Sequence, residues 1–192
     1  VEPQLPIVIV EKPVKKDVQI YGEYVGTIKA ESFVEIHARV EGYLENMMFE
    51  EGKRVKQGDP LFIISPALYK ARVEKAKAQL KKNEVQAAKA ARDVQRLTPL
   101  YEQHAASQLD LDNAIAAKEN AEADVAMSKA DLDQANLELS YTRVTSPITG
   151  YISERLVDIG TLVGPGSKSK LATVVKSDTV NVDFKMTALD YL

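Results

Sequence analysis

Two stretches with an uninterrupted heptad pattern occupy the middle of this 192-residue chain, between residues 66 and 141. In each stretch, apolar or small residues recur at alternating steps of three and four, the spacing of a coiled-coil stripe. The first stripe consists of Tyr69, Val73, Ala76, Leu80, Asn83, Ala87, Ala90, Val94 and Leu97, and the second of Leu111, Ala114, Lys118, Ala121, Val125, Ser128, Leu132, Ala135 and Leu139. The pattern predicts an antiparallel α-helical hairpin over residues 66–141, because two such helices can bury their stripes against each other.

Polar residues interrupt both stripes, and we expect Asn83, Lys118 and Ser128 to fix the register of the two helices at some cost in stability. Each helix spans about 30 residues, which corresponds to about 45 Å at the rise of an α-helix. A hairpin of that length is too long to pack against a small β domain. We therefore expect it to project toward solvent or toward another protein.

Charge is sorted between the two helices. The first arm, residues 67–97, carries nine basic and three acidic residues, whereas the second, residues 108–139, carries two basic and eight acidic residues. Opposite signs favour pairing within the hairpin and equally favour pairing with the arm of a neighbouring copy. Exposed ion pairs contribute only about tenths of a kcal/mol each, so the sorting would select partner and register. A charged surface that is simply solvated explains the pattern equally well.

The tip of the hairpin is expected at residues 98–108. Thr98 before Pro99 has the form of an N-cap followed by proline at the first helical position, which predicts a kink or a restart of the first helix. Ser107, followed three residues later by Asp110, predicts a capping box that begins the second helix.

The segments on either side of the hairpin carry the same β pattern. Residues 33–40 alternate apolar and polar side chains, and short apolar runs separated by glycine-containing turns follow. At a constant offset of 108 residues the second segment matches the first, pairing Gly42 with Gly150, Tyr43 with Tyr151, Gly52 with Gly160, Val55 with Val163, and Gly58 with Gly166. We interpret this as two copies of a four-strand unit, neither of which can bury its apolar face alone. The six glycines are interpreted as turn positions that need a positive φ or close backbone approach.

Further β-type runs lie outside this repeat, at residues 7–10, 18–21 and 180–186. They are too few to close a sheet and would leave unpaired edges. We therefore expect that the chain is cut inside a domain.

The composition argues against several classes of site. The chain has no cysteine, which excludes a thiolate nucleophile, and a formal net charge of −3, which gives no basic field for nucleic acid. Its two histidines, His37 and His104, fall in different predicted elements, and the pair Met47-Met48 lacks a third ligand. No apolar run is long enough to span a membrane. We expect no catalytic residue, cofactor, metal or nucleic-acid partner.

Three motifs carry a family resemblance: Val40-Glu41-Gly42-Tyr43-Leu44, the run from Glu51 to Gly58, and the run from Tyr141 to Gly150. With the split β unit, they make the chain resemble the periplasmic adaptors, or membrane fusion proteins, of RND-type tripartite efflux pumps. The resemblance implies an elongated α+β fold, a split lipoyl-like β-sandwich with an inserted antiparallel coiled-coil hairpin and part of a β-barrel. The implied boundaries are 1–30 and 175–192 for the barrel part, 31–65 and 142–174 for the lipoyl-like domain, and 66–141 for the hairpin.

The resemblance also implies a function and a site. The chain would bridge an inner-membrane RND transporter and an outer-membrane channel for export of drugs or other small molecules, without catalysis, and would self-associate as a trimer or hexamer. Arg96, Leu100 and Ser107 match the spacing of the family residues that contact the channel. The full-length protein would lie in the periplasm, attached to the inner membrane by an anchor upstream of this chain.

Alternative functions within and outside the family are an adaptor for an ABC-type or metal exporter and a biotinyl or lipoyl carrier module. A hairpin of about 45 Å favours a transporter with its own large periplasmic part, and hence RND efflux. A carrier module needs an acceptor lysine on a tight turn between its halves, and the whole hairpin stands at that position.

Overall fold

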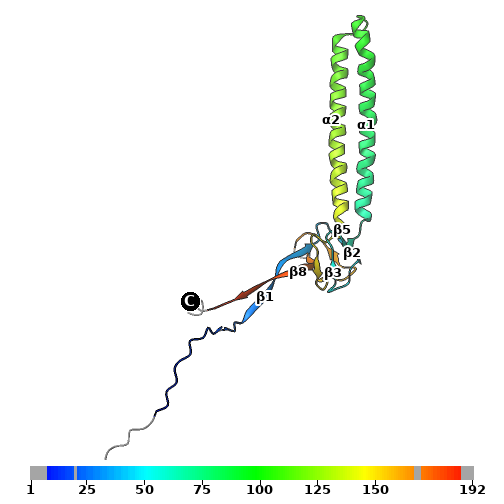
Figure 1. Ribbon diagram of the computed structural model, residues 1–192. Helices are drawn as coiled ribbons and strands as arrows, with labels where there is room; N and C mark the ends of the chain where they lie inside the picture. Colours follow the sequence, from blue (N-terminus) through cyan, green and yellow to red (C-terminus); the bar gives the residue numbers. More distant parts are fainter. Residues whose placement is uncertain (1–7, 20, 167–169, 187–192) are drawn as a thin grey trace, which may run out of the picture. The chain divides into compact units, whose positions relative to one another are not determined.

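A computed structural model describes residues 8–19, 21–166 and 170–186 of the chain (Figure 1). The chain divides into two compact units, one formed by Ala30–Val180 and the other by Val1–Lys29 with Asn181–Leu192. The larger unit contains a two-sheet sandwich and a helical hairpin.

The sandwich consists of eight strands in two four-stranded sheets. Their bounds are β1, Gly26–His37; β2, Gly42–Met47; β3, Arg54–Val55; β4, Pro60–Ile64; β5, Arg143–Thr145; β6, Gly150–Ile152; β7, Leu162–Val163; and β8, Lys170–Phe184. One sheet has the order β1-β8-β6-β3 and the other β5-β4-β2-β7. Each sheet therefore takes two strands from before the hairpin and two from after it.

The repeat predicted from the sequence is confirmed by this topology. Exchanging β1, β2, β3 and β4 with β5, β6, β7 and β8, respectively, converts one sheet order into the other. Backbone hydrogen bonds repeat in the same way: the N–H of Leu44 donates to the carbonyl of Thr161, and that of Ile152 to the carbonyl of Lys53, both at 3.0 Å. The two halves are thus related by an approximate twofold operation.

The core lies between the two sheets and draws on both halves. Its fully buried side chains include Leu44, Leu61, Phe62, Ile64, Ile152, Val163, Leu171 and Val174. The alternation predicted for residues 33–40 is confirmed, since Ile36, Ala38 and Val40 are buried while the polar residues between them are exposed. Because burial of about 25 cal/mol per Å² of apolar surface is the main driving force, neither half can form a stable core without the other.

The repeated glycines occupy equivalent conformations. Gly52 and Gly160 have φ of +74° and +88°, and Gly58 and Gly166 have φ of +88° and +108°. A Cβ at Gly42 would lie 2.7 Å from Cγ2 of Ile64, and one at Gly150 would lie 2.4 Å from the carbonyl oxygen of Val175. The four turn glycines are thus in the left-handed region, and the two strand glycines permit close packing.

The hairpin consists of α1, Ala67–Glu102, and α2, Gln108–Tyr141, which run side by side (Figure 1). Every residue of the two predicted stripes is buried or half-buried, whereas nearly all other positions of the arms are exposed. The coiled-coil prediction is therefore confirmed. With 36 and 34 residues, the helices are about 54 and 51 Å long at the standard rise, somewhat longer than expected from the sequence.

The predicted restart of the first helix at Pro99 is wrong, because α1 continues through Pro99 to Glu102. Thr98 is not an N-cap; its hydroxyl donates to the carbonyl of Val94 at 2.9 Å. Pro99 lies in the last turn, so the missing N–H removes one helical hydrogen bond with few bonds beyond it. The capping box at Ser107 is confirmed.

The smaller unit departs from expectation at its N-terminal side. Strands were predicted at residues 7–10 and 18–21, but residues 8–10, 18, 19 and 21 are not in strands, and residues 7 and 20 lie outside the described part. The predicted strand at 180–186 is confirmed as far as Phe184, where β8 ends. Within this unit, the rings of Tyr24 and Phe184 are 6.0 Å apart, and Lys29 Nζ lies 2.6 Å from Asp183 Oδ2.

Candidate functional site

The hairpin replaces the turn that would otherwise join two paired strands. β4 and β5 are antiparallel neighbours with Phe62 opposite Val144, and α1 and α2 leave from their adjacent ends. At the base, the hydroxyl of Tyr69 donates to the carbonyl of Glu41 at 2.8 Å, and the guanidinium of Arg39 lies 5.2 Å from the ring centroid of Tyr141. These contacts anchor both arms to the sandwich.

Two of the three polar stripe residues meet inside the hairpin. Asn83 Nδ2 donates to Ser128 Oγ at 2.5 Å, and Ser128 Oγ donates to the carbonyl of Asp124 at 2.7 Å. A buried polar pair is satisfied in one register only, so it opposes sliding of one helix along the other. Lys118 instead pairs with Glu122 on its own helix at 3.5 Å and makes no such link.

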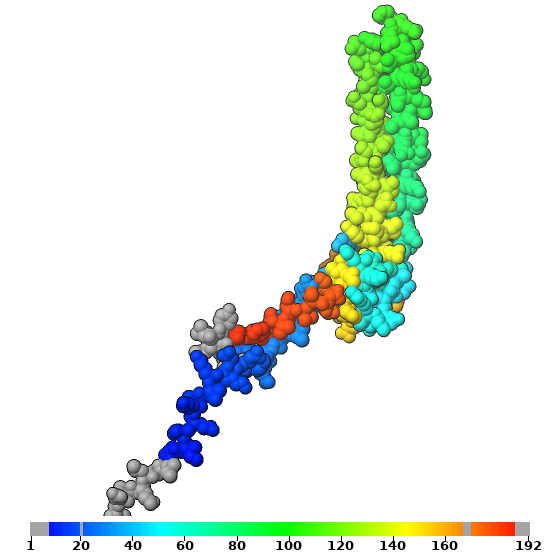
Figure 2. All heavy atoms as spheres, in the orientation of Figure 1, coloured from blue at the N-terminus to red at the C-terminus, as the bar shows by residue number. Residues whose placement is uncertain are grey.

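The sorted charges of the arms are largely unused inside the hairpin. Among the described residues, one ion pair joins the arms, between Arg72 Nη1 and Glu138 Oε2 at 3.1 Å. The other ion pairs of the helices connect residues three or four apart on the same arm. The two arms lie side by side in Figure 2. All nine basic residues of α1 are exposed, as are all the acidic residues of α2 except the half-buried Glu138, so a basic face and an acidic face remain open.

The end of α1 is closed by a left-handed residue that is not glycine. His104 has φ of +59°, its N–H donates to the carbonyl of Tyr101 at 2.9 Å, and the N–H of Ala105 donates to that of Leu100 at 2.7 Å. This is the hydrogen-bond pattern of a Schellman motif, in which glycine is usual at the left-handed position. The sequence did not indicate it, because the signal for this ending is a glycine.

The start of α2 is fixed by reciprocal bonds at Ser107. Its Oγ accepts from the N–H of Asp110 at 3.2 Å and donates to Asp110 Oδ2 at 2.7 Å, while its N–H donates to the same carboxylate at 3.4 Å. The tip loop is thus short and closed by hydrogen bonds on both sides.

Of the three residues expected to contact a channel, Arg96 and Leu100 are one helical turn apart on α1, and Ser107 caps α2 at the same end of the hairpin. Arg96 Nη2 lies 2.9 Å from Asp93 Oδ1, yet its side chain is 71 % exposed. Leu100 is 38 % exposed. The tip therefore presents a cation and an apolar group beside the cap of α2.

The candidate metal ligands among the described residues are dispersed. Within the described ranges, no three His, Cys, Asp or Glu residues are grouped to hold a metal ion. His37, on β1, lies 3.2 Å from Glu35, whereas His104 is in the tip loop. None of the described helices has the length and apolar character needed to cross a bilayer.

A split sandwich with a helical hairpin between its halves is the architecture of a membrane fusion protein. The family model of the barrel-sandwich hybrid domain of RND membrane fusion proteins matches residues 32–175. The chain belongs to this family.

Curated relatives agree with this assignment. The chain is 41 % identical over 186 residues to the efflux pump periplasmic linker BepD of Brucella suis biovar 1 (strain 1330), covering 96 % of this chain and 47 % of the relative. It is 35 % identical over 188 residues to the multidrug resistance protein MdtA of Proteus mirabilis (strain HI4320), covering 98 % and 46 %. The chain spans just under half the length of these relatives.

A solved structure shows the same arrangement. The crystal structure of a MacA–MexA chimera containing the Pseudomonas aeruginosa MexA α-hairpin domain superimposes with a TM-score of 0.63 and 29 % identity. The match covers 86 % of this chain and 55 % of the chimera.

Proposed function

We propose that this chain is the hairpin-bearing part of a periplasmic adaptor that links an inner-membrane RND transporter to an outer-membrane channel for export of drugs or other small molecules. The observation that carries the proposal is the hairpin, about 50 Å long, anchored at its base and capped at its tip. The relatives named as efflux pump linker and multidrug resistance protein support the same role. The adaptor acts by binding, without catalysis.

The tip is proposed to contact the channel through Arg96, Leu100 and Ser107. The exposed guanidinium of Arg96 offers forked donors that suit carbonyl or carboxylate groups. Leu100 adds an apolar contact beside it. Within the cap, the hydroxyl of Ser107 accepts one hydrogen bond from the N–H of Asp110 and donates one to the Asp110 carboxylate. The role of Ser107 at the channel is therefore to hold the loop in shape as well as to make a contact.

Self-association is proposed to use the open faces of the arms. The basic face of α1 would lie against the acidic face of α2 of a neighbouring copy, in a trimer or hexamer. Support comes from the single ion pair between arms among the described residues, which leaves most of the sorted charge for a neighbour. Such pairs add little affinity each but select partner and register.

The boundaries of the parts belong to the same proposal. Residues 31–65 and 142–174 would form the lipoyl-like domain, residues 66–141 the hairpin, and residues 1–30 with 175–192 part of a β-barrel domain. The adaptor would lie in the periplasm, attached to the inner membrane through a segment upstream of this chain.

Site-specific crosslinking in cells tests the tip contact. The chain has no cysteine, so in the full-length protein Ser107→Cys adds the one thiol of this part, at the tip, for a cysteine-reactive photocrosslinker. Lys89→Cys, an exposed position partway along α1, is the matched control. We expect a product with the outer-membrane channel from Ser107→Cys and not from Lys89→Cys. If the tip variant gives no more channel product than the control, the tip assignment is wrong.

A further inference from the structure

A wide groove lies where the hairpin meets the sandwich, at the opposite end of the hairpin from the tip. It shares Lys70 alone with the basic face of α1. Its volume is about 1090 Å³, and its walls come from β1, β5, the start of α1 and the end of α2. β1 and β5 are the outermost strands at one side of their sheets. The groove therefore lies along one edge strand of each sheet, beside the helix ends.

The floor of the groove is apolar. Val34, Ile63, Leu139, Tyr141 and Val144 all line it. Leu139, Tyr141 and Val144 are half-buried and pack against the sandwich core, so their positions are fixed without any ligand. A preformed apolar surface of this size is what a drug-sized or lipid-sized apolar body requires.

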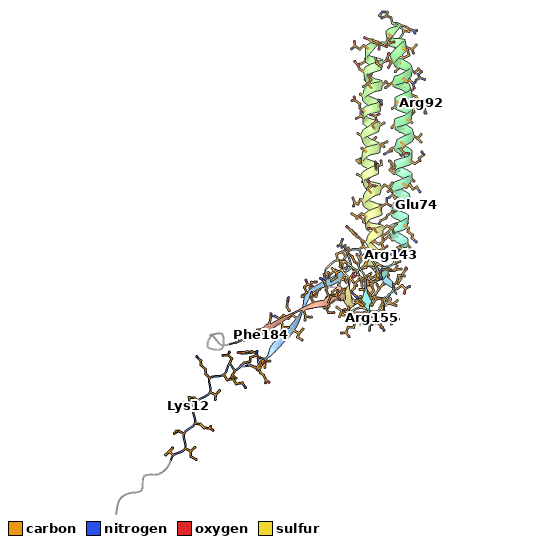
Figure 3. The ribbon with its side chains drawn as sticks, in the orientation of Figure 1. Lys12, Glu74, Arg92, Arg143, Arg155 and Phe184 are labelled. Carbon is orange, nitrogen blue, oxygen red and sulfur yellow. The ribbon has the colours of Figure 1, made fainter. Side chains whose placement is uncertain are left out.

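The rim of the groove is cationic. Arg39, Lys70 and Arg143 line it, and no described carboxylate lies within ion-pair distance of any of the three, although Arg39 stacks on Tyr141. Figure 3 shows Arg143 at the junction of the helices and strands. Three cations beside an apolar floor thus lack a counter-charge within the described part of the chain.

The single carboxylate among the lining residues does not neutralise the positive charge of the rim. Glu35 Oε1 accepts from Lys170 Nζ at 2.6 Å, and its Oε2 lies 3.2 Å from His37 Nε2. The Lys170 ammonium, with a smaller effect from His37, holds the pKa of Glu35 below its ordinary value. Glu35 is therefore ionised and already neutralised by groups of its own, and the rim keeps its excess of positive charge.

We propose that this groove binds an amphipathic anion, a molecule with an apolar body and one carboxylate, sulfate or phosphate group. The apolar body would lie over Leu139, Tyr141 and Val144, and the anionic group would be held by Arg143 and Lys70. The guanidinium can bind such a group through two parallel hydrogen bonds. A neutral body of the same shape would gain only the apolar contact, and a cationic one would be repelled.

The occupant is a small molecule rather than an acidic polypeptide. The free edges of β1 and β5 are able to accept an extended peptide. The groove volume of about 1090 Å³, however, is only slightly above the range of roughly 300–1,000 Å³ for small-ligand sites. The site stands apart from the proposed channel contact, so its occupancy can be measured on the purified chain alone.

Fluorescence titration with 11-(dansylamino)undecanoate, an anionic fatty-acid probe, tests the proposal below the concentration at which the probe forms micelles. Its methyl ester is the matched neutral probe. The variants are Arg143→Gln and Lys70→Gln, with Arg92→Gln as control, an exposed cation on α1 far from the groove (Figure 3). Unchanged helical circular dichroism and unfolding midpoint establish that each variant is folded.

We expect saturable binding of the acid at one site per chain, and about tenfold or greater weakening by Arg143→Gln and by Lys70→Gln, because a charge-assisted hydrogen bond contributes about a factor of ten or more. Arg92→Gln should bind as the unaltered chain does, and the ester should bind at least about tenfold more weakly. Equal binding of acid and ester, equal binding by the groove variants and the control, or no saturable binding would each overturn the proposal. The last result would leave the acidic polypeptide as occupant.

Discussion

The two strand glycines that are equivalent in the halves of the sandwich should respond unequally to alanine. At Gly150 the new Cβ would lie 2.4 Å from the backbone carbonyl oxygen of Val175 in β8, whereas at Gly42 it would lie 2.7 Å from a methyl group of Ile64. A backbone atom held in a hydrogen-bonded strand cannot move without its strand, but a methyl group can be displaced by a small rotation of its side chain. Although the two positions are equivalent in the approximate symmetry of the sandwich, Gly42 should tolerate alanine better than Gly150 does.

The geometry sets the size of the difference. A Cβ essentially never lies closer than 3.0 Å to another heavy atom, so Gly150→Ala must move β8 by about 0.6 Å against β6, and Gly42→Ala must move the methyl group by about half that distance. Overpacking of a dense core costs about 1–3 kcal/mol. We expect Gly150→Ala to destabilise by about 3 kcal/mol or more, because it also disturbs the β6–β8 ladder, and Gly42→Ala by about 1–2 kcal/mol.

Urea unfolding of the chain, followed by tyrosine fluorescence and by far-ultraviolet circular dichroism, measures both free energies. Gly164→Ala is the control, since its Cβ would meet Glu41 at an ordinary 3.4 Å, and it should change the free energy of unfolding by less than about 0.5 kcal/mol. A Gly42→Ala cost equal to or above that of Gly150→Ala would refute the reasoning, as would a change below about 1 kcal/mol for both.

Three further outcomes follow from the hairpin and the strand surface. A double-mutant cycle of Asn83→Ala and Ser128→Ala should give a coupling of about 1 kcal/mol in urea unfolding, because the side chains share a hydrogen bond of 2.5 Å; a coupling near zero would contradict the register role. His104→Gly should raise the free energy of unfolding by roughly 0.5–1 kcal/mol by relieving the left-handed φ of +59°, and Ala105→Gly, the control, should not raise it. Lys170 is the main cause of the lowered pKa of Glu35. The Glu35–Lys170 pair therefore stabilises the folded chain fully above about pH 4.3, the pKa of a free glutamate. This stabilisation is lost as the pH falls through the lower pKa that Glu35 has in the folded chain. Unfolding midpoints of the unaltered chain and of Glu35→Gln should therefore converge on acidification from pH 6 to about pH 3, and a constant gap would argue against the pair.

The sequence carried most of the information for the hairpin and for the internal repeat. The stripe from Tyr69 to Leu97 could be identified because helical packing repeats locally, and the glycines at constant offset marked the two halves. The interleaving of those halves could not be predicted, since the pairing of β2 with β7 joins Gly42 to Val163, residues that lie more than a hundred positions apart in the sequence. Local sequence patterns do not indicate which strand of one half pairs with which strand of the other half.

The errors and omissions also have local causes. Pro99 predicted a helix start because proline favours the first helical position. Close to the end of a helix, however, proline costs little stability, and the coiled-coil packing of α1 against α2 stabilises the helix as far as Glu102. The left-handed His104 gave no signal, because a histidine in that conformation is selected by the tight tip rather than by its own preference. Of the candidate site, the sequence indicated Arg96, Leu100 and Ser107. It did not indicate the groove at the base, whose three cations come from the loop after β1, from α1 and from β5.

The interleaved sheets have a consequence for how the chain acquires its structure. Strands made before residue 65 cannot complete either sheet until residues 143–175 have been synthesised, because each sheet needs strands from both sides of the hairpin. The entropy of closing so long a loop would slow that encounter. Formation and pairing of the two helices are local and rapid. They bring Ile64, at the end of β4, close to Arg143, at the start of β5, at the base of the hairpin. Formation of the hairpin thus brings the two halves of the sandwich close together and lowers the entropy cost of their pairing. The same helices that are proposed to contact other proteins therefore first assist the folding of the domain that carries them.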